Sequence, residues 1–158
     1  MTQQTHSILI LDDDKIILIA LREALAAEGY EVCIYENPNE ALKKVREQDF
    51  SIIISDQRMP EMTGLEFFAK VKNIQPDASR ILITGVLTLK TIIDAVNQGE
   101  IYRFIAKPWM REEMLATIHN ASQRYELIKA NQQLQQDTLE LNDELARKNR
   151  EMAASLEE

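Results

Sequence analysis

Residues 7–14 have the sequence SILILDDD, a short apolar run that ends in three aspartates. Apolar runs of similar length recur at 31–35, 50–55, 80–84 and 101–105. The first and third runs do not alternate with polar residues, which is typical of parallel strands that are covered on both faces. We therefore predict a parallel sheet of five strands.

Amphipathic segments separate the apolar runs. They predict helices at 14–28, 37–48, 63–74 and 88–98, and a fifth helix from Trp109 onward. The first helix should end at Gly29, and Asn37 should cap the second, with Pro38 in its first turn. Strands and helices that alternate in this way predict an α/β fold with a doubly wound sheet.

Composition excludes several classes of protein. The net charge of −8 argues against direct binding of nucleic acid, which needs a basic surface. No apolar run is long enough to span a membrane, and the first residues do not form a signal peptide. The single cysteine, Cys33, is expected to be a small buried residue in a reducing compartment, so we expect a cytoplasmic protein. His6 and His119 are expected on the surface.

The distribution of glycine and proline predicts where the compact domain ends. All four glycines and all four prolines lie at or before Pro108, and the last fifty residues contain neither. Because these residues punctuate folded structure, their disappearance indicates a change of architecture. We expect a domain at 1–122 and a helical extension at 123–158.

Polar residues that could form a site follow four of the predicted strands: Asp12, Asp13 and Asp14; Asp56; Thr84; and Lys107. In an open parallel sheet, sites form beyond the carboxyl ends of the strands, so these side chains should meet. Carboxylate ligands without nearby histidine or cysteine favour Mg²⁺. A magnesium site with a lysine, a hydroxyl and a spare carboxylate is suited to phosphoryl transfer, with one carboxylate as the nucleophile.

Each of these residues also has a simpler interpretation. One of the three consecutive aspartates could cap the first helix, and Asp56 could be a turn residue before Pro60. Thr84 alone would be an ordinary strand residue, and Lys107 alone would be a hydrated lysine. Three aspartates exceed what a cap needs, and the convergence of all four segments favours a site.

The sequence resembles the receiver domain of response regulators from Ser7 to about Ser122. The matching motifs are ILILDDD (8–14), IIISDQRMPEMTGLE (52–66), ILITG (81–85) and FIAKPW (104–109). The resemblance implies a flavodoxin-like sheet of order 2-1-3-4-5. It also implies a signalling switch that is no enzyme beyond Mg²⁺-dependent self-phosphorylation and slow autodephosphorylation.

The resemblance also implies a role for each matching residue. Asp56 accepts a phosphoryl group from a sensor histidine kinase or a phosphotransfer protein. Asp12, Asp13, Asp56 and the backbone carbonyl of Arg58 hold Mg²⁺. Thr84 and Lys107 bind the phosphoryl group, and Lys107–Pro108 is a cis peptide. Phe104 falls at the position of a switch aromatic, although a plain core residue is an equal alternative.

The sequence departs from the commonest pattern of the family in small ways, and one segment resembles a particular kind of receiver. Phe104 replaces the frequent tyrosine and so offers no hydroxyl. Arg58 and Val86 occupy positions that tune the lifetime of the phosphoaspartate in this family. The segment GEIYRFIAKPW (99–109) looks most like receivers attached to HD-GYP phosphodiesterases, and less like those joined to winged-helix DNA-binding domains.

Two rival functions are open. A flavodoxin-like domain that binds a nucleotide or flavin has the same strand order, but it needs a phosphate-cradling loop where this chain has three aspartates. A dimerisation module with an inactive receiver would not need clustered carboxylates.

The last part of the chain has a heptad pattern. Its expected dimer seam consists of Leu127, Asn131, Leu134, Thr138, Leu141 and Leu145, with leucine at d and mostly polar residues at a. The next d position is Lys148, where the seam should weaken. We expect a parallel homodimer. Its interface is this helix, or the face formed by the fourth helix, the fifth strand and the fifth helix, or both. The alternative is a single exposed helix.

Overall fold

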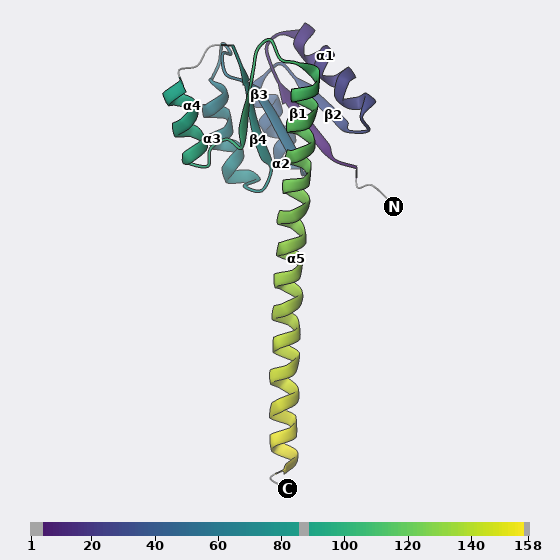
Figure 1. The fold of residues 1–158 in the computed structure, drawn as a ribbon. Helices are drawn as coiled ribbons and strands as arrows, with labels where there is room; N and C mark the ends of the chain where they lie inside the picture. Colours follow the sequence, from purple (N-terminus) through teal and green to yellow (C-terminus); the bar gives the residue numbers. More distant parts are fainter. Residues whose placement is uncertain (1–4, 86–88, 157–158) are drawn as a thin grey trace. The chain divides into compact units, whose positions relative to one another are not determined.

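The structure of the protein, a computed structural model, describes residues 5–85 and 89–156 (Figure 1). Its strands are β1 (Ser7–Leu11), β2 (Glu31–Tyr35), β3 (Ile52–Asp56), β4 (Ser79–Thr84) and β5 (Arg103–Ala106). Its helices are α1 (Lys15–Ala27), α2 (Pro38–Glu47), α3 (Gly64–Ile74), α4 (Leu89–Asn97) and α5 (Arg111–Leu156). The strands and helices alternate as predicted.

The five strands form one parallel sheet with the order β2-β1-β3-β4-β5. This confirms the predicted fold, including the strand order. Nearly every residue of β1, β3 and β4 is buried, whereas the edge strands β2 and β5 are more exposed. Burial on both faces explains why the central strands read as continuous apolar runs.

Helices cover both faces of the sheet. On one face, α1 and α5 pack against isoleucines of the four strands β1, β3, β4 and β5, with Met114 and Ile118 of α5 fully inside. On the other face, α2, α3 and α4 pack around three buried phenylalanines: Phe50, Phe67 and Phe68. The sheet is therefore the middle of three layers, and its carboxyl edge stays open for a site.

The ends of the helices follow local signals in the sequence. The Asn37 side chain accepts hydrogen bonds from the backbone N–H groups of Asn39 and Glu40, so it caps α2 as predicted. Gly29 follows α1 with a φ of 92°, a conformation that glycine adopts without strain. Trp109 and Met110 precede α5, which begins at Arg111.

The contacts within the chain divide it into two units, and the compact one ends at Tyr125, three residues beyond the expected boundary. The second unit begins at Glu126 and holds the rest of α5. Within the described residues, no helix combines the length and the apolar character that a membrane span requires.

The expectation that His6 lies on the surface is wrong. Its side chain is buried, and its Nδ1 lies 2.8 Å from the Ser51 hydroxyl oxygen. The ring also meets the Tyr125 ring edge-on, at 6.4 Å between centroids. Burial is tolerated because a polar ring atom keeps a hydrogen-bonding partner. His119 is exposed, and Cys33 is half-buried.

Candidate functional site

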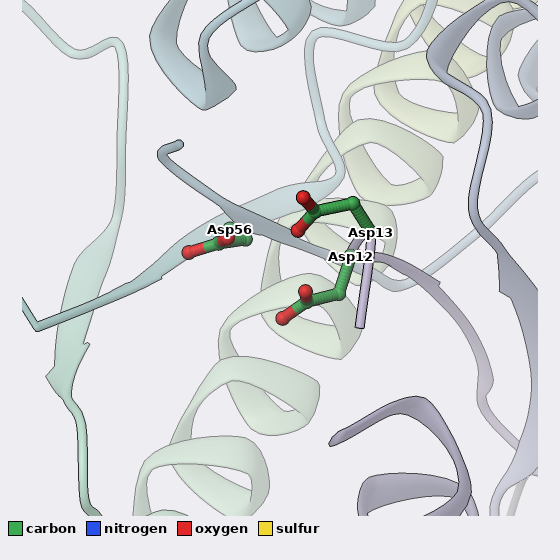
Figure 2. Close-up of side chains that lie close together, drawn as sticks. All are labelled: Asp12, Asp13 and Asp56. Carbon is green, nitrogen blue, oxygen red and sulfur yellow. The ribbon is translucent and has the colours of Figure 1, made fainter. Parts of the chain in front are cut away.

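Three carboxylates converge at the carboxyl edge of the sheet. Asp12 and Asp13 directly follow β1, and Asp56 is the last residue of the neighbouring strand β3. One carboxylate oxygen from each residue lies within 4.8 Å of the others (Figure 2). Asp12 and Asp56 are buried and Asp13 is exposed, so the cluster is open on one side.

Lys107 supplies the cation that such a cluster needs. It follows β5, and its Nζ lies 3.2 Å from a carboxylate oxygen of Asp12 and 3.2 Å from one of Asp56. The backbone N–H of Lys107 also donates to the Thr84 carbonyl oxygen at 3.0 Å, which joins the ends of β5 and β4. Thr84 is buried at this edge. The structure thus places the predicted Lys107 against the acidic cluster and Thr84 at the end of the adjacent strand.

The charges of the cluster are only partly compensated. Burial raises the pKa of Asp12 from its ordinary value of 3.8 to about 6, and the nearby charge of Asp56 adds to this, although a backbone hydrogen bond from Asp14 and the charge of Lys107 oppose it. Burial lowers the pKa of Lys107, but Asp12 and Asp56 outweigh burial, and the net pKa is raised. The site therefore has the electrostatics of a cation-binding site.

The raised pKa of Asp12 predicts a pH-dependent stability. Between pH 3.8 and about 6 the folded chain binds the Asp12 proton more tightly than the unfolded chain, so stability should fall as pH rises through this window. Above it, the buried carboxylate costs up to about 3 kcal/mol. In EDTA at pH 7, Asp12→Asn should therefore raise the free energy of unfolding by about 1–3 kcal/mol in urea titrations.

Asp14→Asn is the matched control for that measurement. Asp14 caps α1, since its side chain accepts from the backbone N–H of Ile16 at 2.9 Å, and asparagine caps equally well. This exposed substitution should change stability by less than about 0.5 kcal/mol. An Asp12→Asn protein no more stable than Asp14→Asn would contradict the assigned burial cost.

The three consecutive aspartates therefore divide into two groups. Asp14 caps α1, whereas Asp12 and Asp13 belong to the acidic cluster.

Gln57 is a site residue that the sequence did not indicate. Its backbone N–H donates to an Asp56 carboxylate oxygen at 2.9 Å, and its side-chain oxygen accepts from the Leu65 N–H at 3.0 Å. These bonds tie the loop after β3 to the first turn of α3. A side chain that reaches eight residues forward leaves no signature of spacing, so the sequence offered no signal for it.

Gly64 allows α3 to approach the end of β3 closely. A Cβ at this position would lie 2.4 Å from the Asp56 carbonyl oxygen and 2.7 Å from Leu82 Cδ1. We predict that Gly64→Ala lowers the free energy of unfolding by about 1–3 kcal/mol, because backbone must shift to make room. Chemical denaturation measures this loss.

Gly85→Ala is the control for Gly64→Ala. A Cβ at Gly85 would meet Lys107 atoms at 3.7 Å and beyond, which is ordinary contact. Its stability should stay within about 1 kcal/mol of the parent protein. Equal losses in the two variants would show that close packing against Asp56 is not what requires glycine at position 64.

The remaining predicted residues have mixed outcomes. The Lys107–Pro108 peptide bond is cis, in agreement with the expectation. Phe104 is 41% exposed, so it is not a plain core residue. Arg58 is exposed, and the role of its backbone carbonyl stays a prediction. Val86 lies outside the described residues.

Comparison with known proteins decides the family. The sequence profile of the response regulator receiver domain matches residues 8–119. The chain belongs to this family. A curated relative of the receiver chain is the hydrogenase transcriptional regulatory protein HoxA of Cupriavidus necator, which is 35% identical over 121 residues, or 77% of this chain and 25% of that protein. The receiver chain spans about a quarter of the length of the curated relatives it matches.

Solved receiver structures have the same fold. The signal receiver domain of an HD domain-containing protein from Pseudomonas fluorescens is 29% identical with a TM-score of 0.75, covering 82% of this chain and 96% of that one. The beryllofluoride-activated NtrC4 receiver domain dimer is 34% identical with a TM-score of 0.71, covering 75% and 98%. Because the chain belongs to the receiver family, a flavodoxin-like domain that binds a nucleotide or flavin is excluded. The similar proteins include both a transcriptional regulator and an HD domain-containing protein.

Proposed function

We propose that this receiver accepts a phosphoryl group on Asp56 from a histidine kinase or phosphotransfer protein and controls an output through its C-terminal helix. The observation that carries the proposal is the convergence of Asp12, Asp13 and Asp56 on one point with Lys107 beside two of them. Membership of the receiver family supports it.

The donor set fits Mg²⁺. Asp12, Asp13 and Asp56 offer hard oxygen ligands within reach of one another, and no histidine or cysteine belongs to the cluster. The Arg58 carbonyl is the further protein ligand that we propose. Bound Mg²⁺ would neutralise the negative charge of the phosphoryl oxygens. The pKa of the buried Asp12 carboxylate is raised, so a bound cation would stabilise the charged form of this group.

The protein's own residues have distinct roles in this proposal. A carboxylate oxygen of Asp56 attacks phosphorus, and the bond from phosphorus to the donor histidine nitrogen breaks as the new bond forms. Before the reaction, the Lys107 ammonium group pairs with the negatively charged carboxylate of Asp56. After the reaction, it can pair with the phosphoryl group. In this proposal the hydroxyl of the buried Thr84 donates a hydrogen bond to that group, and Phe104, which is partly exposed, responds as the switch aromatic.

Two surfaces support a homodimer. The exposed leucines 127, 134, 141 and 145 follow the heptad along α5. Ile93, Val96 and Phe104 are exposed apolar side chains of α4 and β5. A receiver that is 34% identical to this chain forms a dimer when activated with beryllofluoride. We propose a cytoplasmic dimer that binds neither membrane nor nucleic acid directly.

The proposed chemistry is tested by incubating the purified protein with a small-molecule phosphodonor and recording its intact mass. With Mg²⁺ we expect one phosphoryl adduct per chain, and in EDTA almost none. An adduct that forms equally well in EDTA would contradict the magnesium-dependent site. The protein could instead stay unmodified by the small-molecule donor with Mg²⁺ but accept phosphate from a phosphorylated kinase. That result would mean that the site reacts with protein donors only.

A further inference from the structure

Six exposed apolar side chains of α5 after Tyr125 form a stripe along the helix. The stripe consists of Leu127, Leu134, Leu141, Leu145, Met152 and Leu156. Successive members are separated by seven, seven, four, seven and four residues. In an uninterrupted heptad, the step of four after Leu141 leads from a d position to an a position, so Leu145 and Met152 would lie at a. That register also places Lys148 at d and leaves Leu156 at e, outside the core.

An uninterrupted heptad creates a conflict at Lys148. With Leu127, Leu134 and Leu141 at d, the next d position is Lys148, which would enter the seam. The Lys148 Nζ lies 3.4 Å from a Glu144 carboxylate oxygen, and both side chains are largely exposed. Placing the lysine in a seam would strip water from this ion pair, and desolvation of a charge is costly.

A stutter removes the conflict. In a coiled coil, a stutter is an insertion of four residues that locally unwinds the supercoil. If it falls between Leu141 and Leu145, then Leu145 and Met152 take d positions and Leu156 takes an a position. Lys148 moves to g and Glu144 to c, so their ion pair stays hydrated. The apolar stripe then reaches the end of the described helix without a charged core residue.

We propose that α5 pairs in parallel with a second copy of this chain along a seam with a stutter between Leu141 and Leu145. The a positions of this register favour an identical partner. They are Asn131, Thr138, Asn142, Asn149 and Leu156. A polar side chain at a is best matched by the same side chain from a copy in register. The inference rests on the dimer in the proposed function and adds its register.

The positions that flank the seam also permit a second copy. The e and g positions of the two segments are Ile128, Ala130, Gln135, Asp137, Ala146, Lys148, Ala153 and Ser155. Only two of these residues are charged, and their charges have opposite sign. Two identical helices in register therefore meet little like-charge repulsion along the seam.

Disulfide cross-linking of single-cysteine variants tests the register. Each variant of the full chain carries Cys33→Ser and one new cysteine, and mild oxidation is followed by non-reducing electrophoresis. Leu134→Cys, at d in both registers, is the positive control, and Leu139→Cys, at b, is the negative control. With the stutter, Asn149→Cys lies at a and should cross-link as efficiently as Leu134→Cys. Lys148→Cys lies at g and should cross-link several-fold less.

The outcomes separate the register from the dimer. Efficient cross-linking through Lys148→Cys, with little through Asn149→Cys, would show an uninterrupted heptad and overturn the stutter while the parallel dimer stands. If Leu134→Cys does not exceed Leu139→Cys and light scattering finds a monomer, the dimer itself fails and the proposed seam fails with it. Phosphorylation of Asp56 is untouched by either result.

Discussion

An Asp56→Asn protein should take up phosphate from a small-molecule donor at a rate lowered by about 10³-fold or more, because an amide is not a nucleophile. Asp56 ends β3 beside Asp12 and Lys107, and asparagine has nearly the same volume, so the fold should persist. Intact mass against time, with Mg²⁺ present, measures the rate. Circular dichroism of the variant verifies that the fold is retained.

Asp14→Asn is the matched control for this prediction. It changes an aspartate near the site to asparagine, but Asp14 caps α1 and does not belong to the cluster of Asp12, Asp13 and Asp56. We expect its phosphorylation rate to stay close to that of the parent protein. If Asp56→Asn reacted as fast as Asp14→Asn, another residue would be the acceptor.

Leu134→Lys combined with Leu141→Lys should dissociate the proposed dimer. Both leucines are more than half exposed in the single chain and lie at d positions of the seam. Each buried leucine contributes about 1.5–3 kcal/mol, and a dimer contains four of them, so the loss exceeds about 6 kcal/mol. This corresponds to a dissociation constant raised by about 10⁴-fold, before the cost of burying lysine is added.

Light scattering coupled to size exclusion measures this effect, and Leu139→Lys is its control. Leu139 is 60% exposed but lies at b, away from the seam. This variant should remain a dimer at the concentration at which the double variant is a monomer. If the double variant stayed dimeric, the α4, β5 and α5 face would be the dimer interface. If Leu139→Lys also dissociated, the heptad assignment would be wrong.

Much of the fold follows from the sequence because the central strands are buried on both faces. In a strand, successive side chains point to opposite faces of the sheet. A continuous apolar run such as Ile52–Ile54 is therefore kept out of water when both faces are covered, as they are in this parallel sheet. The site follows almost directly, since parallel strands bring Asp12, Asp56 and Lys107 to the same edge. Helix caps such as Asn37 were predictable because they act within three residues.

Residues whose role depends on distant contacts could not be predicted in the same way. Arg80 looked like the polar first residue of a strand, yet it is buried and donates to the carbonyl oxygens of Pro76, Ala78, Gly99 and Glu100. Burial lowers its pKa, and the nearby Arg124 adds to this. The partner of His6 is 45 residues away in the sequence, and that of Gln57 lies eight residues away, across a loop. Local pattern carries no information about such pairings.

Identification of the modified residue in the parent protein shows whether Asp56 carries the phosphoryl group. Borohydride reduces an acyl phosphate on aspartate to homoserine, which peptide mass spectrometry then locates after phosphorylation with Mg²⁺. We predict this conversion at Asp56 alone. Conversion at Asp12 or Asp13 instead, or a phosphate found on a histidine with Asp56 intact, would contradict the proposed function.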